Sequence, residues 1–144
     1  MDQYDISKIV NNTIQSSQYC IFSYLSIEGT PTGKALSMPR KTDLNGIYWF
    51  STVNHSEKVD GCRQYPKASL YFFDPNQFIG VSLSGSVEVI DDFEQKRAFW
   101  QDGDEMFYPN GIDGDDYVIL KFTTQTGKLY AQIQHFRFTA DILG

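Results

Sequence analysis

A hairpin turn, a strand and the start of a helix follow one another in the stretch Asn45-Gly46-Ile47-Tyr48-Trp49-Phe50-Ser51-Thr52-Val53-Asn54-His55-Ser56-Glu57-Lys58. The Asn-Gly pair predicts a two-residue β-hairpin, because both residues tolerate a positive φ. The β-branched and aromatic residues that follow, 47–52, predict a strand. Ser56 can then cap a helix over 55–64, whose short inward face consists of Val59 and Cys62.

The rest of the chain reads mainly as short β segments separated by turn residues. Further strands are expected at residues 19–25, 34–40, 68–74, 78–90, 117–123, 128–134 and 135–140. Gly80 and Gly85 lie inside one of them, and glycine within a strand often marks a bulge or a close approach by another group. One helix is expected over 91–102, and another near the N-terminus, where Ile6, Ile9, Val10 and Ile14 recur at helical spacing.

These elements predict one mainly β domain that spans residues 1–144. Seven or eight strands with two or three short helices are too much antiparallel structure for a doubly wound fold. They suit a closed or split β-barrel with short peripheral helices. Aromatic residues make up 15% of the chain, which fits bulky side chains packed between strands and could also supply rings that stack on a flat ligand.

Charge and cysteine content narrow the possible functions. The formal net charge is −6 and no cluster of Lys and Arg occurs, which argues against a general nucleic-acid surface, because such surfaces depend on clustered cations. Cys20 and Cys62 have no metal-ligand spacing and are interpreted as buried free thiols. No apolar run approaches the roughly 18 residues of a membrane span. Residues 1–14 lack a signal-peptide core, so a cytoplasmic location is expected.

The start of the 55–64 helix is a candidate anion site. A helix N-terminus offers free N–H groups and a partial positive charge, to which Ser56 would add a hydroxyl and Lys58 a full charge. Together they would form a phosphate cradle. The alternative is that Ser56 is only the helix cap and Lys58 is solvated. A cation in the first turn opposes the helix dipole, however, so Lys58 there calls for a compensating partner.

A second candidate segment is the strand before the hairpin, residues 33–38. Hairpin pairing would put this strand beside 47–52, near Ser51 and Thr52, so that Lys34 could contribute a second cation to the same site. The alternative is a solvent-facing lysine on a sheet edge.

The order and spacing of these segments resemble the pyridoxamine 5′-phosphate oxidase-like flavin-binding split barrels, in particular their general stress protein 26-like branch. The resemblance covers roughly residues 5–142. It begins with a basic residue followed by two small or apolar ones, and continues with an aromatic-x-Thr-x-x-x-Ser-x-Lys motif. The later matching parts are Trp100 and the segments 65–72, 81–92, 107–111 and 117–122.

What the resemblance implies is a bound flavin mononucleotide (FMN). Lys34 stands where the family has a basic residue near the flavin phosphate or ring, and Ala35 and Leu36 would offer backbone groups to the ring edge. The pair that contacts the ring and ribityl chain corresponds to Ser51 and Thr52, next to the motif aromatic Phe50. The phosphate ligands correspond to Ser56 and Lys58.

The resemblance also implies a homodimer with cofactor sites at the subunit interface. Trp100, Phe107 and Tyr108 are expected to line the partner's pocket. The implied activity is that of an FMN-dependent oxidoreductase acting on an unknown small molecule, with NAD(P)H as a candidate reductant. Two alternatives stay open: a flavin-binding store or redox sensor without turnover, and a split barrel that binds a deazaflavin or haem.

Three departures argue against oxidation of pyridoxamine phosphate itself. Position 57 is Glu where the oxidase has a second phosphate-binding Arg, and position 80 is Gly where it has a flavin-contacting Gln. The Trp and Arg of its C-terminal substrate motif are not evident in residues 127–130. No resident metal is expected, because His55 and His135 lie far apart and the Asp-rich turn 113–116 lacks the terminal Glu of a calcium loop.

Overall fold

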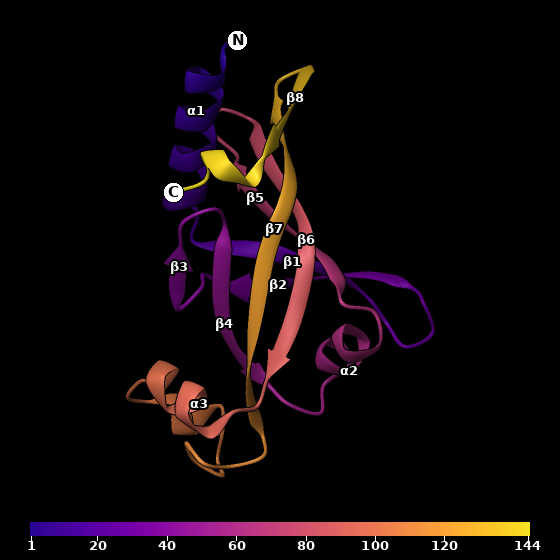
Figure 1. The fold of residues 1–144 in the computed structure, drawn as a ribbon, viewed down its shortest axis with the longest axis vertical. Coiled ribbons are helices and arrows are strands. Elements are labelled where there is room, and N and C mark those ends of the chain that lie inside the picture. Colours follow the sequence, from indigo (N-terminus) through magenta and orange to yellow (C-terminus); the bar gives the residue numbers. More distant parts are fainter.

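The computed structural model describes residues 1–144 as one antiparallel sheet with three α-helices around it (Figure 1). The strands are β1 (Tyr19–Leu25), β2 (Pro31–Ser37), β3 (Lys41–Asp43), β4 (Ile47–Val53), β5 (Lys67–Asp74), β6 (Ile79–Ile90), β7 (Tyr117–Ala131) and β8 (Gln134–Thr139). The helices are α1 (Gln3–Ser16), α2 (Glu57–Gln64) and α3 (Phe93–Phe99), with short 3-10 turns at Asp104–Met106 and Ala140–Ile142. The sheet order is β2-β1-β5-β6-β7-β4-β3, and β8 pairs with β7. The predicted mainly β fold with peripheral helices is confirmed.

α1 lies against β5 and β6 and closes one side of the core. Asp2 caps it by accepting a hydrogen bond from the amide of Asp5 at 2.8 Å. The side chains of Ile6, Val10 and Ile14 are buried against the sheet, as their spacing predicts. No helix of the protein is both long and apolar enough to span a membrane.

β6 and β7 are the long central strands, and they run side by side along most of the molecule (Figure 1). Their register shifts between Ser84 and Gly85, so the predicted link between a glycine and a strand irregularity is confirmed there. Gly85 has no room for a side chain, since a Cβ atom would lie 2.0 Å from the carbonyl oxygen of Thr123. The bulge bends the strand pair and helps the sheet to curl around its core.

β7 is a single strand of 15 residues where two strands were expected. The predicted break over 124–127 is wrong, because Thr124, Thr126 and Gly127 pair with β6 and only Gln125 is unpaired, at the register shift. Gly127 is needed for packing and not for a turn, since a Cβ atom there would lie 2.3 Å from the ring of Phe138.

The predicted partner of the 34–40 strand is also wrong. β2 begins three residues earlier than expected and pairs with β1, with Lys34 opposite Phe22, through a turn closed by the hydrogen bond from the Ser26 amide to the Thr30 carbonyl at 3.0 Å. The strand that pairs with β4 across the Asn45-Gly46 turn is the three-residue β3. The turn itself is confirmed, with φ values of 65° and 70° at its two residues.

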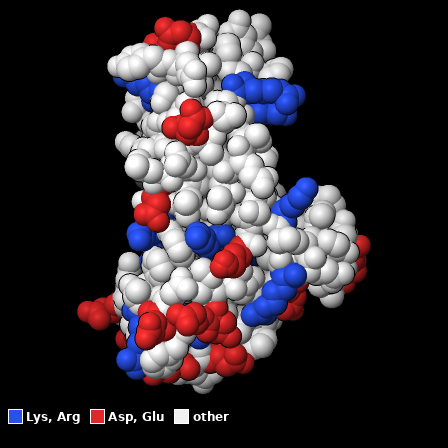
Figure 2. Space-filling model, viewed as in Figure 1, with Lys and Arg blue, Asp and Glu red and all other residues white.

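Residues 91–116 form a separate lobe at one end of the molecule, called the α3 lobe below (Figure 1). It contains nine of the chain's 18 acidic residues but only two of its 12 basic ones. Figure 2 shows these acidic side chains gathered in the lower part of the molecule. The expected 91–102 helix is shortened to α3, which begins at the Asp92 cap and ends before Trp100.

Candidate functional site

Lys58 in the first turn of α2 is a buried cation without a partner. Only 5% of the residue is exposed, yet its ammonium group takes part in no ion pair and no hydrogen bond within the protein. Burial, together with the nearby charge of Lys34, lowers the pKa of Lys58 to about 8. Largely buried charges are normally paired, so this ammonium group is available to an anion from outside the chain.

Ser56 caps α2 at the same end. Its hydroxyl oxygen accepts a hydrogen bond from the amide of Val59 at 3.3 Å, and the hydroxyl donates to the carbonyl of Val53 at 3.0 Å. Ser56 is therefore the N-cap of α2, as the alternative interpretation of this residue states. For Ser56 to donate to an external anion as well, its hydroxyl would have to rotate away from Val53.

The approach of α2 to the β1–β2 hairpin brings the two lysines close. A Cβ atom at Gly61 would lie 2.2 Å from the carbonyl oxygen of Leu25, so this helix packs directly on the end of β1. Lys34 sits opposite Phe22, and paired residues on antiparallel strands project from the same face. Lys34 thus lies on the α2 side of the sheet, near enough to affect the pKa of Lys58. The two lysines are therefore close together, although the strand pairing that brings them together differs from the expected one.

β2 offers backbone groups as well as a cation. It lies at the edge of the sheet and is paired only with β1, so its other edge is free. In an antiparallel strand alternate residues direct both N–H and C=O to the same edge. Of the neighbours Ala35 and Leu36, one therefore presents its backbone donor and acceptor on the free side, as a ligand ring edge would require.

The three site residues predicted at the end of β4 do not all face the same side of the strand. Phe50 is 3% exposed and belongs to the main core. Thr52 faces the same side, is buried, and has no hydrogen-bond partner for its hydroxyl. Ser51 faces the other side, toward the α3 lobe, since successive residues of a strand point to opposite faces.

Ser51 nevertheless has its own unsatisfied group. Its hydroxyl oxygen is buried without a hydrogen-bond partner. It lies near Tyr117, whose pKa is raised mainly by burial, an effect that Ser51 opposes. The Tyr117 hydroxyl donates instead to the carbonyl of Lys96. The unpartnered hydroxyls of Ser51 and Thr52 therefore lie on opposite faces of β4.

Trp100 and Phe107 lie in the α3 lobe and do not approach α2 of the same chain. The Trp100 ring packs edge-on against Tyr117, with a centroid separation of 5.3 Å, and beside Tyr108 at 6.0 Å. Phe107 projects outward and is 68% exposed. Their assignment to a partner's pocket stays a prediction.

Three polar contacts near these elements were not predicted from the sequence. Arg40 binds both carboxylate oxygens of Asp104, at 2.8 and 2.9 Å, which lowers the pKa of that carboxyl group. Lys96 donates to Asp91 at 3.1 Å and to the Gly114 carbonyl at 3.0 Å. The first contact joins the α3 lobe to the segment before β3, and the second lies within the lobe. No sequence pattern pairs residues that are 64 positions apart, as Arg40 and Asp104 are.

His55 makes the third contact, at the loop between β4 and α2. Its Nε2 lies 2.7 Å from Asp115 Oδ2, and the backbone of His55 has a φ of 58°. Both side chains are largely exposed. The pair links the loop that precedes the α2 cap to the α3 lobe. No cluster of three or more His, Cys, Asp or Glu residues suited to a metal ion occurs.

Comparison with known proteins places this arrangement in a family. The model of the family described as "Pyridoxamine 5′-phosphate oxidase like" matches residues 5–142. A solved protein from Clostridium acetobutylicum, described as related to general stress protein 26 of B. subtilis (pyridoxinephosphate oxidase family), is 31% identical, with a TM-score of 0.84. The alignment covers 97% of this chain and 98% of that one. No curated protein matches the chain.

Two more distant structures share the fold. A pyridoxamine 5′-phosphate oxidase-related, FMN binding protein from Nostoc punctiforme is 17% identical over 93% of this chain and 86% of that one, with a TM-score of 0.68. A heme binding protein from Mycobacterium smegmatis is 18% identical over 94% of this chain and 58% of that one, with a TM-score of 0.72. The sheet described above is therefore a split barrel of the kind predicted.

Proposed function

This chain belongs to the pyridoxamine 5′-phosphate oxidase-like family, and we propose that it binds FMN with the phosphate at the start of α2. We further propose that it is an FMN-dependent oxidoreductase acting on a small molecule. When bound, FMN supplies the hydride and electron transfer chemistry, while the protein supplies binding, orientation and electrostatics.

The observation that carries the proposal is the unpaired charge of Lys58. A largely desolvated ammonium group without an anion is unfavourable, and a phosphate group would remove that cost by forming a charge-assisted hydrogen bond. Lys34 adds a second positive charge, and α2 adds the free N–H groups of its first turn. This donor set fits a dianionic phosphate.

The remaining predicted ligands fit an elongated molecule that leaves this phosphate site. The free edge of β2 at Ala35 and Leu36 would hold polar atoms of the flavin ring edge. The unpartnered hydroxyl of Thr52 would face the ribityl chain. Lys34, if it does not reach the phosphate, would favour negative charge on the bound ring.

The same geometry argues against pyridoxamine phosphate as the substrate. The space beside Gly80 is filled by Tyr71, whose hydroxyl oxygen would lie 1.9 Å from a Cβ atom there, so a glutamine side chain would require the Tyr71 ring to move. Glu57 puts a negative charge at the start of α2, where the oxidase has an arginine. Two of the oxidase's cofactor-contacting residues are therefore replaced here, and its C-terminal substrate motif is not evident in residues 127–130.

The proposal includes a homodimer that shares its cofactor sites. Trp100 and Phe107 lie away from α2 in the same chain, which suits side chains that would complete the site of a second copy. NAD(P)H is the proposed reductant, and the cytoplasm the proposed location. An alternative is flavin binding without turnover, as a store or redox sensor.

Titration with FMN, followed by quenching of flavin fluorescence, tests the proposal. We expect wild-type protein to bind FMN and Lys58→Met to bind it roughly ten- to hundredfold more weakly, the loss expected for one charged hydrogen bond. Lys8→Met, on the exposed side of α1, makes the same change in net charge and should leave the affinity unchanged. Equal affinities for wild type and Lys58→Met would contradict the phosphate assignment.

The absorption spectrum of the purified protein separates the cofactors. Bands of oxidised flavin would support FMN, whereas a haem Soret band would support the haem alternative. A colourless protein that fails to bind added FMN would contradict both flavin hypotheses. Anaerobic reduction by NADH or NADPH then distinguishes an enzyme from a flavin store.

A further inference from the structure

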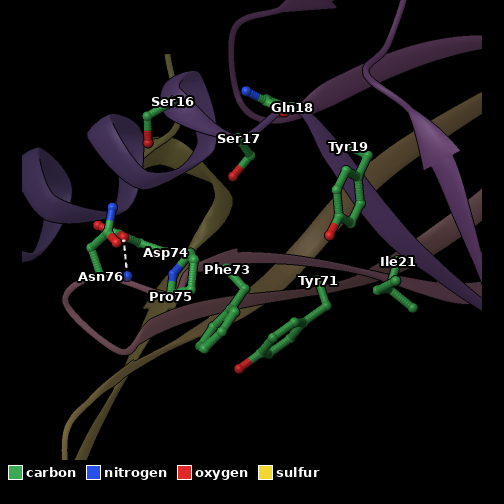
Figure 3. A pocket seen from close by; sticks show the side chains of 10 residues that line it. All are labelled: Ser16, Ser17, Gln18, Tyr19, Ile21, Tyr71, Phe73, Asp74, Pro75 and Asn76. Carbon is green, nitrogen blue, oxygen red and sulfur yellow. Dashed lines mark hydrogen bonds between the residues drawn. The ribbon is translucent and has the colours of Figure 1, made fainter.

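A groove of about 770 Å³ lies among the end of α1, the start of β1 and the end of β5 (Figure 3). None of the residues proposed to bind FMN lines it. Tyr19 and Phe73, which do, are 61% and 39% exposed, and such rings suit contact with the second copy in the proposed homodimer. The contacts that bear on the phosphate site lie instead in the loop between β4 and α2.

This loop has only three residues, 54–56, and its conformation determines where α2 begins. His55 at its centre has a φ of 58°, in the left-handed region that residues other than glycine rarely adopt. Such a conformation persists only where the surrounding contacts impose it. The contacts that hold the loop therefore also fix the Ser56 cap and the first turn of α2, which carries Lys58.

Asn54 holds the loop through three hydrogen bonds and is 4% exposed. Its backbone amide donates to the carbonyl of Asp116 at 2.9 Å. Its side-chain amide donates to the carbonyl of Asp115 at 2.8 Å, and its Oδ1 accepts a hydrogen bond from Arg63 at 3.1 Å. A guanidinium group only donates and a carbonyl oxygen only accepts, so the two partners fix the orientation of the Asn54 amide. The side chain thus joins the end of the α3 lobe to the last turn of α2.

The neighbouring ion pair is a weaker link between the same parts. His55 and Asp115 are both largely exposed, and exposed pairs contribute little to stability because water screens them. The buried hydrogen bonds of Asn54 are therefore the main connection that holds the loop to the α3 lobe.

We propose that Asn54 is a positioning residue for the cofactor phosphate. Its side chain is bonded to Asp115 and Arg63, so it does not contact the cofactor itself. By tying the loop to both of them, it holds Lys58 in its buried position and directs the free N–H groups of α2 toward the phosphate. This role rests on the FMN binding proposed above.

The first measurement needs no cofactor. Asn54→Ala removes the side-chain bonds to Asp115 and Arg63 but keeps the backbone bond to Asp116. We expect the loop to loosen and water to reach Lys58, so that the pKa of Lys58 rises from about 8 by roughly one unit toward its ordinary value. NMR titration of protein with ¹³C-labelled lysine measures this pKa, and the signal missing in Lys58→Met identifies Lys58.

The second measurement is FMN affinity, determined in two backgrounds. Asn54→Ala alone should bind FMN roughly fivefold more weakly or worse, because the phosphate would meet a displaced ammonium group. A residue that acts through Lys58 has little to position once Lys58 is gone. In the Lys58→Met background, Asn54→Ala should therefore change the affinity by roughly twofold at most.

Thr124→Val is the matched control for a merely structural effect. It also removes a buried hydrogen bond from a side chain to a backbone carbonyl, here from Thr124 to Gly46 at 2.7 Å, beside the β3–β4 turn. We expect it to lower the stability to urea comparably, while leaving the pKa of Lys58 and the FMN affinity unchanged.

Three results would overturn the proposal: an unchanged pKa of Lys58 in Asn54→Ala, an equal pKa change in Thr124→Val, or an equal loss of FMN affinity in both backgrounds. If wild-type protein does not bind FMN, the NMR titration still shows whether Asn54 positions Lys58. Failure of this proposal and failure of the FMN proposal are therefore separate outcomes.

Discussion

Two lysines in helices at the same end of the molecule illustrate two uses of a buried cation. Lys58 in α2 and Lys96 in α3 are each 5% exposed. Lys96 donates hydrogen bonds to Asp91 and Gly114 and lies 5.3 Å from the centre of the Tyr117 ring. Lys58 has no such partners, and burial lowers its pKa to about 8. The partnered lysine holds the α3 lobe together, whereas the unpartnered one is suited to a ligand.

The largest effect expected from this comparison is the loss of Lys96. Lys96→Met keeps the packing of the side-chain stem but leaves the Gly114 carbonyl and the Asp91 carboxylate without their shared donor. We expect the free energy of unfolding to fall by about 2–3 kcal/mol, measured by urea denaturation. FMN affinity should change far less than in Lys58→Met. An unchanged denaturation midpoint would mean that the two lysines do not differ as described.

Lys58→Met should act in the opposite direction on stability. Removing an unpaired buried charge should raise the free energy of unfolding of the cofactor-free protein by about 1–2 kcal/mol at pH 7. The wild-type ammonium loses its proton as the pH rises through about 8, whereas in the unfolded chain it keeps the proton to about pH 10.4. Wild-type stability should therefore rise over this pH range and approach that of the variant. A variant less stable than wild type at pH 7 would break the comparison.

Substitutions of Ser56 are expected to have the smallest effects. They distinguish a change in stability from a change in FMN binding. Ser56→Ala removes the α2 cap and should lower the free energy of unfolding by about 1 kcal/mol. Ser56→Asp should restore the cap, because a carboxylate also accepts the Val59 amide, while its negative charge repels a phosphate. We expect Ser56→Asp to be as stable as wild type by thermal denaturation but to bind FMN more weakly. Tight FMN binding by Ser56→Asp would place the phosphate elsewhere.

The sequence predicts the local elements of this fold well because their signals are local. The Asn45-Gly46 turn has the positive φ values that its residues tolerate, and Ser56 caps the helix that follows. Pairing between strands is less local. The 34–40 strand was assigned to β4, but Pro39 has no N–H group for a continuous ladder, and only β3 after it pairs there.

Contacts at the candidate site that join distant parts of the chain are equally hard to predict from the sequence. The approach of Lys34 to Lys58 depends on β1 lying between β2 and α2, which no residue pattern near either lysine encodes. The opposite orientations of Ser51 and Thr52, by contrast, follow from the two-residue period of a strand and were predictable. Tyr71 and Phe73 also lie two residues apart on β5. This outward-facing pair could therefore have been recognised from the sequence as well.

The uneven distribution of charge has a practical consequence for surface measurements. Because the α3 lobe holds nine acidic and two basic residues, the molecule has a substantial electric dipole along its length (Figure 2). On a positively charged sensor surface or resin it should adsorb by that lobe, in one preferred orientation. Such immobilisation would present the opposite end of the molecule, with α1, to the flowing solution, whereas random amine coupling would give mixed orientations (Figure 1).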